Sequence, residues 1–290
     1  VRYVTETGSV VEALLDMVAV SQLNAEGLYN SLTSLLKKHD LPIDNIRGQG
    51  YDGCATMSGS YSGLQSRVKQ TVPSAYFVHC YAHRLNLVIM DVCSQNIFCR
   101  NFFGVVQNLY SFIECSTKRH GLFQQVVRSS NNCGSSKSHS LYSLSTTRWS
   151  SRADNCMVLK NILPAIMKTL KRVETETTFH VRTAGDAVAL SKAIDFEFCL
   201  CLQIMHELLH LCNVLSQSLQ AEHMNISAAS SQIKSLICEV EELRSVSAFD
   251  KQWHDAEILA ESINVEYTES RRRKVSTVLD SNWRNQTLMS

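Results

Sequence analysis

Proline is scarce in this sequence: its 290 residues include only three, together with 11 glycines. Collagen-like, mucin-like and linker-rich proteins need far more of one or both residues, so the composition excludes them and favours long uninterrupted helices. With 44% hydrophobic and 19% charged residues, the chain can bury one large core or two modest ones.

An excess of charge of one sign is also missing. The 28 Lys and Arg residues nearly balance the 27 Asp and Glu residues, which gives a net charge of +1. This balance excludes a protein that holds nucleic acid by bulk charge alone, although it is compatible with a local basic face.

Signals for membranes and for secretion are lacking. No apolar run approaches the roughly 18 residues that cross a bilayer, and no basic N-terminus precedes a short apolar stretch. The 11 cysteines are odd in number and form no C-x-x-C pair, which is typical of reduced, buried thiols. We therefore expect a soluble protein without membrane contact. Because the sequence runs from Val1 to Ser290, which ends a polar stretch, we also expect a segment of a longer polypeptide.

The first part of the chain alternates strand and helix patterns. A first helix is capped by Asn24 and ended by Pro42. Further patterns predict strands at Arg2–Thr5, Val10–Val20, Ile43–Arg47 and Ala75–His79, and helices at Leu64–Lys69 and Ala82–Cys93. This order predicts an α/β sheet with helices on its faces.

After about residue 100, helical patterns dominate, and polar loops such as residues 129–145 separate them. In one series, apolar residues follow one another at alternating spacings of four and three positions, which predicts a seam for packing against another helix. The series is Cys201, Met205, Leu208, Cys212, Leu215 and Leu219. We predict an α/β unit over residues 1–155 and a mainly α-helical unit over residues 156–290.

Asp52 is the first candidate for chemistry, because it lies at or just after the C-terminal end of a predicted strand, where the sites of α/β sheets gather. No Asp or Glu occurs from Gly53 to Met90, whereas three basic residues do: Arg67, Lys69 and Arg84. A lone carboxylate followed by positive charge suits a divalent metal that faces phosphates. The alternative is that Asp52 only stabilises a turn.

Two other segments match motif strings. Gly48-x-Gly50-x-x-Gly53 has the spacing of a dinucleotide fingerprint, but the next acid after it is Asp91, too far along the chain to contact the ribose. His206-Glu207-Leu208-Leu209-His210 matches the zinc motif H-E-x-x-H, but it overlaps the helical seam. Asn213 and Ser216 stand where a metzincin has glycine and histidine. We favour a packing role for this helix.

Two polar clusters suit nucleic acid. Cys80-Tyr81-Ala82-His83, preceded by His79, lies at a strand-to-helix junction, and since no second cluster would complete a zinc site, it suits phosphate contact better. Thr147-Arg148-Trp149 combines a guanidinium with an indole, which can grip a phosphate and stack on a base, unless the indole only edges a core. Arg271–Lys274 reads as a solvated connector, with nuclear import or a DNA backbone contact as the alternative.

Three ordered segments together resemble the transposase domain of the hAT superfamily: N-I-R-G-Q-G-Y-D-G from Asn45, H-C-Y-A-H-R-L-N-L-V from His79, and T-R-W from Thr147. The resemblance covers essentially the whole chain and is closest to the domesticated, transposon-derived group that includes zinc finger MYM-type protein 1-like proteins. It implies a ribonuclease H-like mixed sheet with a D-D-E metal site, interrupted by a mainly α-helical insertion. Active relatives cleave and transfer DNA strands with two metal ions, Mg²⁺ or Mn²⁺.

The resemblance also implies roles for residues. Asp52 corresponds to the second metal-binding aspartate, Cys80 and His83 correspond to the C-x-x-H element near the scissile phosphates, and Trp149 corresponds to a tryptophan that stacks on a displaced base. We expect the neighbouring Arg84 and Arg148 to contact DNA as well.

Departures from the family pattern point to an incomplete site. The first family aspartate precedes the Arg2-Tyr3-Val4 segment, so the first strand is missing, and three later acids lack matching context: Glu266, Glu269 and Asp280. We therefore expect no enzyme activity, Asp52 as a vestigial metal ligand, and no resident metal.

We expect a transposase-derived, nuclear, nucleic-acid-binding domain that binds DNA and self-associates through regions outside this sequence. The alternative is a protein-interaction scaffold built on the helical insertion, without DNA binding.

Overall fold

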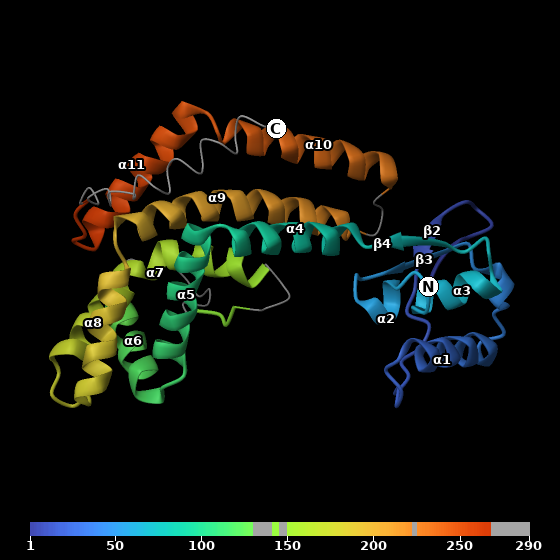
Figure 1. The fold of residues 1–290 in the computed structure, drawn as a ribbon, viewed down its shortest axis with the longest axis horizontal. Helices are drawn as coiled ribbons and strands as arrows, with labels where there is room; N and C mark the ends of the chain where they lie inside the picture. Colours follow the sequence, from blue (N-terminus) through green and yellow to red (C-terminus); the bar gives the residue numbers. More distant parts are fainter. Residues whose placement is uncertain (130–140, 145–149, 222–224, 268–290) are drawn as a thin grey trace, which may run out of the picture.

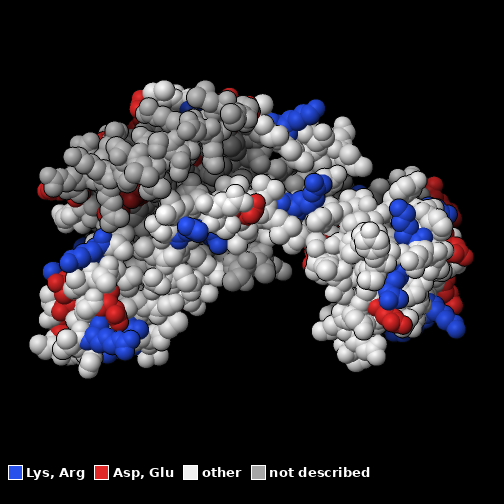
Figure 2. Space-filling view, in the orientation of Figure 1, with Lys and Arg blue, Asp and Glu red and all other residues white. Residues whose placement is uncertain are grey.

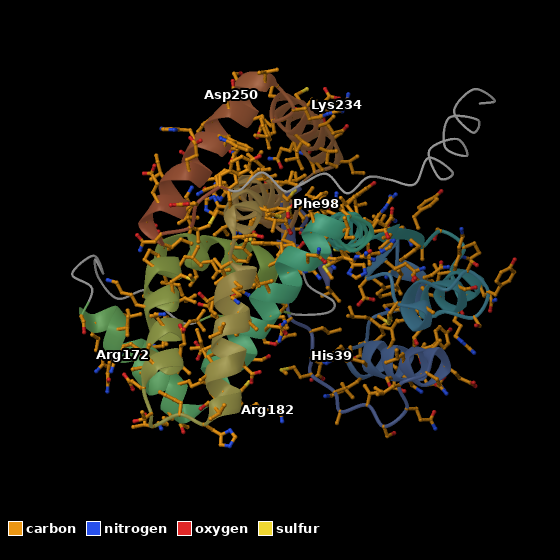
Figure 3. The ribbon with its side chains drawn as sticks, turned by 60° about the vertical axis from the view of Figure 1, so that its left-hand side comes forward. His39, Phe98, Arg172, Arg182, Lys234 and Asp250 are labelled. Atoms are coloured by element: carbon orange, nitrogen blue, oxygen red, sulfur yellow. The ribbon has the colours of Figure 1, made fainter. Side chains whose placement is uncertain are left out.

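The structure is a computed structural model that describes residues 1–129, 141–144, 150–221 and 225–267 (Figure 1). The structure is mostly helical, with 69% of its residues in helices. The described residues form two hydrophobic cores. One belongs to an N-terminal unit, residues 1–80, and the other to a helical body formed by the described residues from Tyr81 onward. Figure 3 shows His39 in the first unit, and Arg172 and Arg182 on the helical body.

The N-terminal unit begins with a hairpin. Strands β1 (Arg2–Val4) and β2 (Val10–Glu12) pair antiparallel, with Tyr3 opposite Val11. Gly8 turns the chain between them with φ +83°, a conformation that glycine adopts without strain. Both predicted strands are present, but the second ends at Glu12 and does not continue to Val20.

Helix α1 (Ala25–Lys38) follows the sequence prediction closely. The Asn24 side chain accepts a hydrogen bond from the Gly27 amide at 2.8 Å, which caps the helix N-terminus. At the other end, Asp16 binds Lys38 at 2.6 Å and His39 at 3.0 Å. These two partners hold the pKa of the Asp16 carboxyl well below its usual range, and they tether the segment after β2 to the helix.

The next strand lies later in the chain than predicted. The prediction of a strand at Ile43–Arg47 is wrong: Ile43–Asn45 forms a 3₁₀ turn, η1, and strand β3 is Gly48–Tyr51. The Gln49 side chain explains this position, because it is buried and its amide donates to the carbonyls of Gln65 and Ala75 at 3.0 and 3.2 Å. Strand β3 pairs parallel with β4 (Tyr76–His79).

The N-terminal core lies beside this strand pair. After the single turn α2 (Ala55–Ser58), helix α3 (Leu64–Thr71) packs against α1 and β4. The core consists of Leu64, Val68, Val72 and Ala75, with partly buried side chains of α1 packed against it. Where one mixed sheet was expected, the described residues form two separate two-stranded ladders, β1–β2 and β3–β4. The ribonuclease H-like mixed sheet therefore stays a prediction.

The helical body contains the larger core. Its helices are α4 (Tyr81–Gln95), α5 (Ile97–Glu114), α6 (Thr117–Ser129), α7 (Ser150–Thr175), α8 (Val181–Ala193), α9 (Phe196–Leu219), α10 (Ile226–Glu242) and α11 (Val246–Ser262). Helix α9 packs against α7, α11, α10, α4 and α5, and the predicted seam is buried at Met205, Cys212 and Leu215. Figure 1 shows α4 leaving β4 and running beside α9.

The two cores of the described residues divide near residue 80, because the smaller one ends at Ala75 and the larger one begins at Ile89. The core of the helical body already includes Ile89, Phe103 and Phe123 from α4, α5 and α6. The predicted boundary at residue 155 falls inside α7, in the middle of this core.

Helix α9 differs from the expectation that no segment is long and apolar enough to cross a membrane. By length and composition alone it could cross a membrane, with a mean hydropathy of 1.5 over its most apolar window. However, 44% of that window is buried, and the polar side chain of Gln203 is buried with it. Its apolar side chains therefore serve the core of the helical body.

Candidate nucleic-acid interface

Several of the residues singled out in the sequence lie where β3 and β4 end. The parallel register places Tyr51 opposite His79, so the residues that follow, Asp52 and Cys80, leave the pair at the same edge. The Cys80 amide donates to the Tyr51 carbonyl at 3.0 Å. We call the residues gathered at this edge the strand-end site: Asp52, Gly53, His79, Cys80, His83 and Arg84.

Asp52 is exposed to solvent and also accepts a hydrogen bond within its own turn. Its Oδ1 accepts a hydrogen bond from the Cys54 amide at 3.3 Å. This bond stabilises the turn, as the alternative interpretation of Asp52 expects. The residue as a whole is exposed to solvent. Hydrogen bonds from the Cys54 thiol and amide lower the pKa of Asp52, and the charges of His83 and His79 lower it further. Asp52 is thus an ionised, accessible carboxylate beside two imidazoles.

The two histidines form a close pair packed against Gly53. Their ring centroids lie 5.6 Å apart. A Cβ atom at Gly53 would lie 2.8 Å from His79 Nε2 and 3.1 Å from His83 Cδ2, so only glycine fits there. The His79 Nε2 atom is buried and has no hydrogen-bond partner in the structure.

Cys80 and Arg84 extend the site onto helix α4. Cys80 precedes the first residue of the helix, with an exposed side chain that makes no capping hydrogen bond. No acidic residue lies in the first turn, and the exposed Arg84 guanidinium lies 6.0 Å from the centroid of the Tyr81 ring. A helix N-terminus with a nearby guanidinium attracts anions, phosphate included.

The site does not fit a pair of Mg²⁺ ions. Magnesium prefers oxygen ligands, and two-metal catalysis needs several carboxylates around the ions. Asp52 supplies one carboxylate, and its neighbours supply imidazole nitrogen and thiol sulfur. Within the described ranges, no group of three or more His, Cys, Asp or Glu side chains is placed to hold a metal ion.

Several predicted residues lie outside the part of the chain that the structure describes: Arg148, Trp149, Glu269, Asp280 and Arg271–Lys274. Their predicted roles stay predictions. Glu266 is described and lies exposed just beyond α11, on the helical body.

The H-E-x-x-H segment lies on α9, where the Glu207 side chain contacts residues of helix α11. Its carboxylate accepts a hydrogen bond from the Gln252 side-chain amide and lies 3.8 Å from the Lys251 ammonium. Burial, followed by the charge of Lys160, lowers the pKa of the half-buried His206. The geometry favours helix packing over water activation by Glu207.

On one face of the molecule, positive and negative side chains are mixed (Figure 2). On the face drawn in Figure 2, Lys and Arg stand singly or in small groups between Asp and Glu and form no continuous band. Affinity for nucleic acid would thus depend on local contacts.

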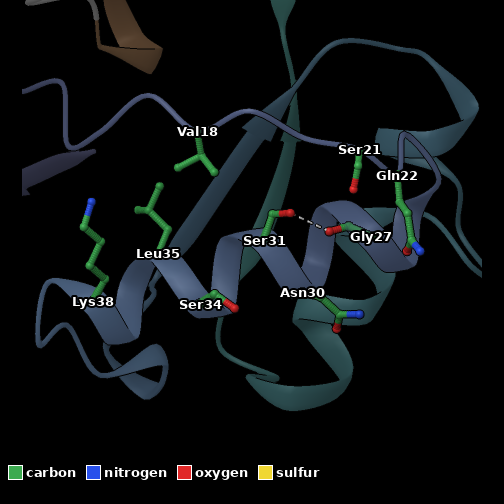
Figure 4. A pocket seen from close by; sticks show the side chains of 9 residues that line it. All are labelled: Val18, Ser21, Gln22, Gly27, Asn30, Ser31, Ser34, Leu35 and Lys38. Atoms are coloured by element: carbon green, nitrogen blue, oxygen red, sulfur yellow. Dashed lines mark hydrogen bonds between the residues drawn. The ribbon is translucent and has the colours of Figure 1, made fainter.

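One cavity that sequence reasoning missed lies away from the strand-end site. It measures about 410 Å³ and lies between the segment after β2 and helix α1 (Figure 4). Its lining is mostly small and polar, and Ser31 donates to the Gly27 carbonyl at 2.8 Å. Lys38, its cationic lining residue, is already paired with Asp16. This leaves the cavity without a free reactive group.

Comparison with known proteins bears on the N-terminal unit. No solved structure matches the chain significantly. Residues 1–63 match the family model described as ZMYM1/FAM200, RNase-like domain, and the matched segment runs from β1 past α2 and includes Asp52. The match supports a transposase-derived protein of the ZMYM/FAM200 type.

Proposed function

We propose that the strand-end site binds the phosphate backbone of DNA, as part of a hAT-type, ribonuclease H-like domain that has lost transposase activity. The observation that carries the proposal is the meeting of Asp52, His79 and His83 at one strand end, at the N-terminus of a long helix whose first turn carries the exposed Arg84. The exposed Arg84 and the first turn of α4 attract phosphate, and the adjacent His83 imidazole offers an N–H donor to it.

Binding without cleavage follows from the same residues. Asp52 is the single carboxylate of the strand-end site, and a two-metal nuclease needs more of them. A lone exposed carboxylate beside a phosphate contact repels DNA unless a cation screens it. Replacing Asp52 by Asn should therefore strengthen DNA binding in the absence of divalent metal.

A salt titration tests the proposal. For B-DNA, each phosphate contact adds about 0.9 to the slope of log affinity against log salt concentration. We expect a mixed-sequence duplex to bind with a measurable slope, and Arg84→Ala to lower that slope by about one contact. Arg182→Ala is the matched control, because Arg182 is also exposed but lies on α8 in the helical body. Equal slopes for the two variants would contradict a contact at Arg84.

The scaffold alternative is favoured by one observation on α4. Along this helix the apolar side chains of Leu87, Val88 and Val92 are 47%, 59% and 56% exposed. Such a face suits a protein partner. A chain that shows no salt-dependent DNA binding, but binds protein through these residues, would make the scaffold the better explanation. The DNA-binding proposal includes a location in the nucleus, and microscopy of a tagged full-length protein tests that location.

A further inference from the structure

An open cavity on the helical body is lined by positively charged side chains. It measures about 430 Å³ and lies between the end of α6 and the second half of α7. Its lining combines three cations with two hydroxyl groups and one apolar side chain: Lys168, Lys171, Arg172, Ser129, Thr175 and Val126. We call it the α6–α7 cavity. Figure 3 labels Arg172 on this part of the helical body.

The three cations share one stripe of helix α7. Lys171 and Arg172 follow Lys168 by three and four positions. Residues at these spacings are neighbours on a helix surface, and like charges there destabilise the helix. Arg128 already supplies a positive charge to the last turn of α6. The stability of the two helices therefore does not explain why three cations gather at this cavity.

Two of the cations have acidic partners that an anion can replace. The Lys171 Nζ lies 3.0 Å from Glu174 Oε2, and the Arg172 Nη2 lies 2.7 Å from Glu176 Oε1. Neither acid lines the cavity. Ion pairs that are open to solvent contribute little to stability, so an anion of higher charge can compete with these carboxylates.

The third cation, Lys168, is exposed and makes no ion pair within the described ranges. The two hydroxyl groups add no free donor, because Ser129 donates to the Gln125 carbonyl at 2.7 Å and Thr175 donates to the Lys171 carbonyl at 3.0 Å. The ammonium and guanidinium groups therefore provide the binding. Such groups bind phosphate through charge-assisted hydrogen bonds.

We propose that the α6–α7 cavity binds a small soluble ligand that carries two or more linked phosphate groups. Its volume falls within the range of small-molecule sites, about 300–1,000 Å³. The three cations lie within about one turn of α7, so they concentrate their charge on adjacent phosphates of one ligand. The cavity belongs to the helical body, so this proposal does not rest on DNA binding at the strand-end site.

Calorimetric titration of the full chain with inorganic pyrophosphate tests the proposal. The titration is carried out in an Arg84→Ala background, which removes the cation of the strand-end site. We expect saturable binding. Lys168→Ala and Arg172→Ala should each weaken it by about tenfold, because each removes a charge-assisted hydrogen bond. Lys192→Ala is the matched control, because Lys192 is an exposed lysine on α8, and it should leave the affinity unchanged.

A lysine footprint gives an answer that does not depend on variants. The unsubstituted chain is acetylated with and without pyrophosphate, and the modified lysines are identified by mass spectrometry. Pyrophosphate should slow the acetylation of Lys168 and Lys171 and leave that of Lys192 unchanged. Equal protection of all three lysines would refute a specific site, as would the absence of saturable binding at millimolar pyrophosphate.

Duplex DNA distinguishes the source of the phosphate. An unchanged salt slope in Lys168→Ala, together with the loss of pyrophosphate binding, supports a small ligand. If Lys168→Ala instead lowers the slope by about one contact, the cavity binds the DNA backbone and the proposal of a small ligand is wrong. Because Arg84→Ala reports on the strand-end site, the two proposals can fail independently.

Discussion

At the scale of single residues, Gly53 does most to shape the strand-end site, because any side chain there would collide with the histidine pair. A Cβ atom would come within 2.8 Å of His79, whose ring is flanked by Phe77 and His83. Replacing Gly53 by Ala should therefore push the imidazoles apart and cost about 1–3 kcal/mol of unfolding free energy, as overpacking does. Urea denaturation measures this loss.

Gly104 provides the matched control. It lies in helix α5, where an added Cβ meets nothing within 4 Å. Gly104→Ala should stabilise the protein by about 0.5–1 kcal/mol, because alanine loses less backbone entropy in a helix. If both variants are equally stable, the close approach at Gly53 does not constrain the histidines.

The strand-end site could be predicted in outline because its residues follow two parallel strands. Asp52 and Cys80 come directly after these strands, and carboxyl ends of parallel strands share an edge. The contact between the Cys99 and Met205 sulfur atoms, 3.8 Å apart, could not be predicted in this way. These residues lie on helices far apart in sequence, and their contact depends on how α5 packs against α9.

At the scale of elements, periodicity and caps located most of the helices in the first part of the chain, whereas strand positions were less certain. Asn24 caps α1 as expected, and Lys37 and Lys38 lie in its last turn, because capping and charge act locally. The displacement of β3 from residues 43–47 to Gly48–Tyr51 has a tertiary cause. The buried Gln49 side chain binds carbonyls at the ends of two other segments, and no local pattern signals that contact.

Asn155 ties an irregular segment to helix α7. It is fully buried, its Oδ1 accepts from the Tyr142 amide at 3.0 Å, and its Nδ2 donates to the Tyr142 carbonyl at 2.8 Å. Asn155→Ala leaves both backbone groups unpaired, so we expect a loss of about 2–4 kcal/mol in thermal or urea unfolding. Asn161→Ala, on the same helix, removes a bond to the Met157 carbonyl at an exposed position. It should cost less than about 1 kcal/mol. Similar losses would mean that Asn155 does not anchor the segment.

At the scale of the whole molecule, the sequence suggested two units, with helical patterns dominating after about residue 100 and a boundary between the units at residue 155. The hydrophobic clusters of the described residues divide near residue 80. Helices α4, α5 and α6 contribute to the larger core, which follows from their packing on α7 and α9. Periodicity shows that a helix has an apolar face, but it does not show which core receives that face.

The separation of the cores predicts that the two units unfold separately. The main packing contacts of α1, α2, α3, β3 and β4 stay within the N-terminal unit, and α4 packs on α5 and α9. The N-terminal core is small, whereas the core of the helical body is extensive. Because a small core gives little stability, the N-terminal unit should unfold first on heating. We expect scanning calorimetry to show two transitions.

Two core substitutions assign these transitions. Val68 is fully buried in the N-terminal core, and Leu163 is fully buried in the helical body. Val68→Ala should lower only the first transition, and Leu163→Ala, at a cost of about 2–5 kcal/mol, should lower only the second. Distant sites with no shared partners act additively, so the double variant should show both shifts unchanged. If either single variant moves both transitions together, the two cores unfold as one cooperative unit, and the division near residue 80 carries no energetic meaning.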